Sequence, residues 1–291
     1  FWIGLYVFVN LASVLYLGGL ALQTILGINM LTAIFGLAAF AAAYSLYGGL
    51  SAVAWTDIIQ VIVLVLGGLI TTYLALDTVS GGKGFLEGLA NIYNAVPDRF
   101  DMILEKTNPE YMNLPGIGVL IGGMWIANLY YWGFNQYITQ RALGAKSLPE
   151  AQKGVMFAAY LKLIMPLVIV LPGICAAVLF PLLETSDKAY PMMMSLLPHG
   201  LLGLTFAALI AAIVSSLASM TNSISTIFTM DVYRTYATSN PSNSRLVNIG
   251  RSTSVIALVI AVFSATPLLG SLESAFQYIQ NFTGFFTPGI L

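Results

Sequence analysis

The feature that most constrains the fold is a series of apolar stretches about as long as a lipid bilayer is thick. A spanning helix needs about 20 mostly apolar residues, and about seven stretches approach that length. They lie near 1–27, 30–47, 52–76, 115–136, 154–181, 198–229 and 247–268, and an eighth begins near 274. No Asp, Glu, Lys or Arg occurs between Phe1 and Thr56. The sequence therefore predicts an all-α integral membrane protein.

Composition supports this class and excludes others. Hydrophobic residues make up 58% and charged residues 8% of the chain, whereas soluble domains carry about 25% charged residues. The net charge of −1 argues against binding nucleic acid. The single cysteine, Cys175, excludes an internal disulfide framework and a cysteine-built metal site. Because the chain begins and stops within apolar stretches, we expect a fragment of a longer protein.

The charged loops indicate one orientation. Basic residues exceed acids in loops 137–153 and 230–251, which are separated by two spans, so both loops are expected in the cytoplasm. Loops 77–114 and 182–197 then face outward. Within 77–114, the apolar residues between Phe85 and Val96 indicate a short surface helix. Gly48–Gly49 is expected to separate the second and third spans.

Lys162 is expected near the bilayer midplane, roughly 12 Å from the cytoplasmic start of its span. A charge at that depth costs at least ~3 kcal/mol, so it favours a role in a substrate or ion path over snorkelling to the interface. Asn128, roughly 20 Å from the outside, lies at a similar depth. The two side chains therefore indicate one site.

Gly122–Gly123 precede Asn128 and weaken its helix, as in the broken helices that form transporter sites. Tyr131, three residues after Asn128, shares its face and has a ring that can stack on a ligand. Helix packing through glycine explains the same pattern about equally well. Phe276 and Gln280, at i and i+4 of the last span, also fit ordinary packing.

Small and hydroxyl residues line the sixth span. Ser215, Ser216 and the carbonyl of Ala212 offer oxygen atoms of the kind that hard cations prefer, although close helix packing explains most of the run. Asp57, near the cytoplasmic end of the third span, fits either the positive N-terminal end of a helix or a cation relay. His199 is the only histidine and no His-Glu-x-x-His motif occurs, so an enzyme of the metal-hydrolase kind is not expected.

Four motifs carry a resemblance to a known family. They are Trp55–Thr56–Asp57–Ile58–Ile59–Gln60, Gln140–Arg141–Ala142–Leu143–Gly144–Ala145–Lys146–Ser147, Ala211–Ala212–Ile213–Val214–Ser215–Ser216–Leu217–Ala218–Ser219 and Ala275–Phe276–Gln277–Tyr278–Ile279–Gln280. In this order they resemble the solute:sodium symporter family, and in particular its bacterial sodium/galactose (sodium/glucose) branch. The resemblance covers essentially the whole chain.

The resemblance implies a fragment of a LeuT-like core, an inverted repeat of five plus five helices. Residues 1–76 would be the last three helices of the first repeat, 77–114 an extracellular loop, and 115–291 a truncated second repeat. The fragment would then hold about seven complete transmembrane helices and the start of an eighth. The family's first core helix, which supplies further sodium ligands and sugar contacts, matches no residue of this chain.

The resemblance also implies roles for individual residues. Asn128, Lys162 and Gln280 match sugar-contacting positions, while Tyr131 matches the inner gate and Phe276 the outer gate. The family's sodium site falls on Ala212, Ser215 and Ser216, and Asp57 matches an acid implicated in sodium release.

The implied function is sodium-coupled sugar transport by alternating access, with sodium as the co-transported ion. The expected partners are a sugar, sodium and the lipid bilayer, and the expected location is the plasma (inner) membrane, crossed several times. Sialic acid, inositol or an amino acid stays open as the solute. A channel is a weaker alternative.

Overall fold

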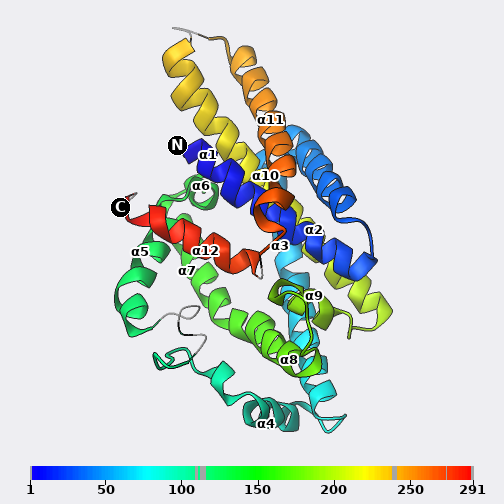
Figure 1. Ribbon diagram of the computed structural model, residues 1–291. Coiled ribbons are helices and arrows are strands. Elements are labelled where there is room, and N and C mark those ends of the chain that lie inside the picture. The colour runs from blue at the N-terminus through cyan, green and yellow to red at the C-terminus, as the bar shows by residue number, and fades with distance from the viewer. Residues whose placement is uncertain (1, 109–110, 112–115, 238–240, 273, 290–291) are drawn as a thin grey trace. The chain divides into compact units, whose positions relative to one another are not determined.

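The computed structural model describes residues 2–108, 111, 116–237, 241–272 and 274–289, without the side chains of residues 2 and 47–54. Every regular element in these ranges is a helix (Figure 1). Five helices are long and apolar enough to cross a membrane: Ile3–Leu26, Trp55–Val79, Leu148–Leu179, His199–Ala237 and Asn243–Leu269. Met30–Leu46 is a shorter apolar helix. The predicted all-α membrane class is confirmed.

The chain divides into two compact units. Unit 1 combines Phe1–Leu64 with Gly203–Ile279, and unit 2 combines Val65–Leu202 with Gln280–Leu291. Helix α3 (Met30–Val79) contributes to both units, as does α12 (Ala275–Phe286).

Unit 1 is built around α10 (His199–Ile227) and α11 (Asn243–Leu269). α10 continues as the π-helical segment η8 (Phe228–Ala237). The first helical stretch consists of α1 (Trp2–Leu5), η1 (Tyr6–Leu11) and α2 (Ala12–Leu26), of which η1 and α2 pack along α11. Fully buried apolar side chains from these helices and α3 form the core: Leu11, Leu15, Ile34, Val214, Leu217 and Ile224.

Helix α3 contains both the second and the third predicted span. Its backbone stays helical through Gly48–Gly49, so the glycine pair lies between the second and third spans without ending the helix. However, the hydroxyls of Tyr44 and Thr56 form a hydrogen bond, although twelve residues of straight helix would separate them by about 18 Å. The helix must therefore bend between these residues. Glycine pairs permit such bends without ending the hydrogen-bond ladder.

Unit 2 contains the remaining helices. The segment that follows loop 77–114 consists of η4 (Val119–Gly123), α5 (Met124–Leu129), η5 (Tyr130–Phe134) and α6 (Gln136–Leu143). A long helix follows, formed by α7 (Leu148–Met165), η6 (Pro166–Val170) and α8 (Leu171–Leu179). Next come η7 (Ser186–Lys188) and α9 (Ala189–Met194). The final turn, η9 (Thr287–Gly289), contacts α5.

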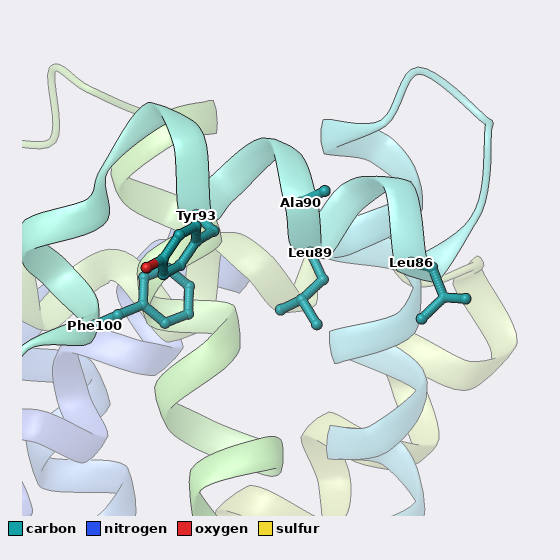
Figure 2. A pocket seen from close by; sticks show the side chains of 5 residues that line it. All are labelled: Leu86, Leu89, Ala90, Tyr93 and Phe100. Carbon is teal, nitrogen blue, oxygen red and sulfur yellow. The ribbon is translucent and has the colours of Figure 1, made fainter.

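The predicted surface helix is confirmed as α4 (Phe85–Ala95), which is followed by η2 (Pro97–Phe100). Ile92 of α4 is buried with Leu76 of α3 and with Cys175 of α8. Gly88 permits this packing, because a Cβ there would lie 2.0 Å from the Leu76 carbonyl oxygen. Beside this cluster, Figure 2 shows a hollow lined by Leu86, Leu89, Ala90, Tyr93 and Phe100. With a single hydroxyl among these side chains, this surface has few groups to orient a polar solute.

Two predicted cytoplasmic loops are partly helical. α6 and the first turns of α7 occupy much of 137–153, while η8 and α11 leave only a short connection within 230–251. Hydropathy shows where lipid ends, whereas helices continue as long as their backbone groups stay paired. Lys153 and Glu150 form a 2.9 Å ion pair on the first turns of α7. Pro115, where the fourth span was predicted to open, lies outside the described residues.

Candidate functional site

Two of the residues assigned to sodium meet directly in unit 1. The Ser215 hydroxyl, buried on α10, donates a hydrogen bond to Oδ1 of Asp57, which is half-buried on α3. The two residues are 158 positions apart in sequence. Ala212 and Ser216 lie on the same turn of α10 and are both half-buried. A carboxylate and two hydroxyls on neighbouring helices are suitable ligands for a hard cation.

Asp57 has two interpretations, an acid at the N-terminal end of a helix and a cation relay, and its position in α3 bears on the first. Asp57 lies inside α3, far from the first residue, Met30. Asp57 is therefore outside the first turn of α3, where the positive end of the helix acts, but it directly follows the bend in this helix, so both interpretations stay predictions. Its bond to Ser215 is consistent with the second interpretation, a cation relay.

Lys162 has an aromatic partner in unit 2. Its Nζ lies 4.8 Å from the centroid of the Trp132 ring, within the range of a cation–π contact. Neither of the ion pairs found among the described residues, Lys153–Glu150 and Lys188–Glu184, involves Lys162. Lys162 is exposed and its ammonium group lies against η5, so its role as a site residue stays a prediction.

Trp132 belongs to an aromatic cluster that sequence analysis identified only through Tyr131. The Tyr131 ring packs edge-on against Trp132 at 5.3 Å and against Tyr137 at 6.2 Å. The Tyr137 hydroxyl donates to the Tyr131 hydroxyl at 3.2 Å. We call Tyr131, Trp132 and Tyr137 the aromatic cluster. The sequence signal for Trp132 was its position directly after Tyr131.

Asn128 lies on α5, between two π-helical segments. The expected break at Gly122–Gly123 is instead the π-helical turn η4, and a second π-helical segment, η5, begins at Tyr130. Such turns are frequent at functional sites, because they rotate side chains without breaking the helix. The exposed Asn128 side chain donates from Nδ2 to the Met124 carbonyl at 2.8 Å.

Gln280 and Phe276 are exposed on α12. No hydrogen bond among the described residues joins Gln280 to Asn128 or Lys162. Beyond Gln280, however, the chain returns to α5 through η9. The sugar-contact assignment of Gln280 and the outer-gate assignment of Phe276 stay predictions.

Comparison with known proteins identifies the family. Residues 2–291 match the Sodium:solute symporter family. The chain belongs to the sodium:solute symporter family. The resemblance carried by the four motifs is confirmed.

Similar proteins within the family differ in the solute they are named for. A sodium/glucose cotransporter of Vibrio parahaemolyticus is 57% identical over all of this chain and 56% of its own length. A bovine sodium/myo-inositol cotransporter 2 is 34% identical over 98% of the chain and 46% of its own length. This symporter chain thus spans about half the length of the curated relatives it matches.

A solved structure supports the fold. The substrate-bound, outward-open state of a Na⁺-coupled sialic acid symporter aligns with a TM-score of 0.76 at 24% identity. The alignment covers 98% of this chain and 60% of the other. The LeuT-like core expected from the resemblance agrees with this neighbour.

Proposed function

We propose that the full-length protein couples inward sodium movement to the uptake of a sugar by alternating access. The observation that carries this proposal is the hydrogen bond between Ser215 and Asp57, which places a carboxylate against a hydroxyl assigned to sodium. Galactose or glucose is the favoured solute, and the plasma membrane is the proposed location. The family consists of transporters rather than enzymes.

In the proposed sodium site, the Ser215 hydroxyl has two alternating partners. In the structure, it donates a hydrogen bond to Oδ1 of Asp57. When sodium arrives, the Ser215 oxygen turns its lone pairs to the ion, together with the Ser216 hydroxyl and the Ala212 carbonyl. Asp57, released from Ser215, is then the nearest anionic group to accept the departing ion. Binding and release thus exchange partners at one hydroxyl.

In the proposed sugar site, polar and aromatic groups have different tasks. Asn128 and Gln280 offer donors and acceptors, and Lys162 offers donors, which suits a polyhydroxylated ligand. The aromatic cluster supplies flat apolar surfaces for the C–H face of a sugar ring. Because Trp132 already contacts the Lys162 ammonium, the lysine is positioned before the ligand arrives.

The alternative solutes follow from two observations. Lys162 has no carboxylate partner among the described residues, so it is also suited to an anionic solute such as sialic acid. Similarity to a myo-inositol cotransporter makes inositol the neutral alternative.

Competition for uptake distinguishes these solutes. We expect unlabelled galactose or glucose to reduce sodium-dependent uptake of labelled galactose by the full-length protein, while myo-inositol, sialate and proline compete weakly. Stronger competition by sialate would instead assign Lys162 to a carboxylate. The absence of sodium-dependent galactose uptake would contradict the sugar assignment.

A further inference from the structure

A polar cavity lies in unit 1, and none of the residues assigned to sodium or sugar lines it. It has a volume of about 380 Å³ and lies between α3, α10 with η8, and α11. Its wall combines hydroxyl side chains, among them Ser225, Thr229 and Ser254, with the guanidinium-bearing Arg251. Ser45 of α3 lines one side, and its hydroxyl donates a hydrogen bond to Oδ1 of Asn222 at 2.8 Å.

The Thr229 hydroxyl is the feature of this cavity that points to a ligand. Thr229 is buried, and its hydroxyl has no hydrogen-bond partner among the described residues, although buried polar groups are nearly always paired. Gly250 of α11 is buried and lies directly against the hydroxyls of the wall. A Cβ there would lie 2.7 Å from the Ser225 hydroxyl oxygen and 3.5 Å from that of Thr229.

The charge of the wall selects an anion. Arg251 is the only ionised residue that lines the cavity within the described part of the chain, and its guanidinium can bind phosphate oxygens through two parallel hydrogen bonds. The surrounding hydroxyls can donate further bonds. A sodium ion is disfavoured in the same space, because Arg251 would repel it.

The depth of the cavity in the bilayer and the residues at its rim favour a lipid over a soluble anion as the ligand. Thr229 lies about 45 Å along the helix from His199, which equals the bilayer thickness including headgroups, so the cavity falls at the predicted cytoplasmic headgroup level. Its rim is apolar: Met230 and Val247 line the cavity and are both exposed. Basic pockets between transmembrane helices on this side commonly hold anionic headgroups.

We propose that this cavity binds the phosphate of an anionic phospholipid from the cytoplasmic leaflet. Arg251 would hold the charge, the Thr229 hydroxyl would donate to a phosphate oxygen, and Met230 and Val247 would contact the glycerol and upper acyl chain. The proposal needs no transport activity, so it stands or falls separately from the symport function.

Binding is tested on the full-length protein, purified in detergent and titrated with short-chain phosphatidylglycerol while its thermal unfolding is followed. We expect phosphatidylglycerol to raise the Tm in a saturable manner, and phosphatidylcholine and inorganic phosphate to have little effect. Arg251→Gln should weaken binding about five- to tenfold, and Thr229→Val, which keeps the shape, about threefold. Gly250→Ala should also weaken it, because the added Cβ would displace the Ser225 hydroxyl from the wall.

Arg245→Gln is the matched control. Arg245 lies on the same helix, but its guanidinium packs 5.8 Å from the Tyr233 ring and does not line the cavity. Its substitution should leave the affinity for phosphatidylglycerol unchanged. Equal affinity of Arg251→Gln, Thr229→Val and the parent would overturn the proposal. An equal Tm rise with phosphatidylcholine would refute specificity for an anionic headgroup. A saturable Tm rise with inorganic phosphate alone would show that the cavity binds a soluble anion instead of a lipid.

Discussion

The exchange of partners at Ser215 predicts that its substitution and that of Asp57 act on the same event. Ser215→Ala removes a proposed sodium ligand and the hydrogen-bond donor to Asp57. Asp57→Asn keeps the shape of the side chain but replaces an ionised acceptor with a neutral one. Ser215→Ala should raise the sodium concentration that gives half-maximal binding of labelled galactose to the purified full-length protein. Asp57→Asn should lower it, because the weakened Ser215–Asp57 bond competes less with sodium for the Ser215 hydroxyl.

The expected coupling follows from the type of hydrogen bond. A hydrogen bond to a charged group contributes about 1.5–3 kcal/mol and a neutral one about 0.5–1.5 kcal/mol. The charge-assisted part of the Ser215–Asp57 bond, which is only half-buried, is therefore about 1–1.5 kcal/mol. In the double variant, the half-maximal sodium concentration should differ from the product of the two single effects by about 5- to 13-fold.

Ser216 provides the matched control. It is the neighbouring hydroxyl on α10 and is also assigned to sodium, but its hydroxyl is not bonded to Asp57. Ser216→Ala alone should raise the half-maximal sodium concentration, and its effect should multiply with that of Asp57→Asn. If the Ser215 pair multiplies in the same way as the Ser216 pair, the partner exchange at Ser215 is refuted.

Substitutions at three further positions test other parts of the structure. Lys162→Ala should abolish most sugar transport while membrane abundance holds or rises, since insertion becomes easier by ~3 kcal/mol; intact uptake would contradict a site role. Tyr131→Ala should speed release of preloaded sugar about 2- to 12-fold and Tyr131→Phe much less, because the ring makes the contact; equal release by Tyr131→Ala and the parent would make it a packing residue. Gly88→Ala should lower the Tm, because its Cβ would meet the Leu76 carbonyl at 2.0 Å, at a cost of about 1–3 kcal/mol. Gly154→Ala, with nothing within 4 Å, is the control, and an equal Tm for both variants would refute the close packing of α4.

The sequence predicted the class of fold because lipid imposes a strong constraint on composition. A stretch such as Asn243–Leu269 is recognisable from its apolar residues alone, since its backbone must be paired within the helix. The bend in α3 was less predictable. The glycine pair marked its place, but whether a glycine pair bends or ends a helix depends on tertiary contacts such as that between Tyr44 and Thr56.

The sequence predicted individual site residues but not the contacts between them. The motifs selected Asp57 and Ser215 separately, but no spacing rule links residues 158 positions apart, so their hydrogen bond emerged only from the fold. Similarly, the depth of Lys162 indicated that it needs a partner without identifying Trp132. The cavity beside Thr229 gave no sequence signal, because serine and threonine in a small-residue helix are typical of close packing.

The most direct test of the central claim is galactose uptake by the full-length protein reconstituted in liposomes, with and without an inward sodium gradient. The account predicts that galactose accumulates above its external concentration only while the sodium gradient is present, and that Asp57→Asn with Ser215→Ala reduces this accumulation. Equal uptake with potassium in place of sodium would contradict it.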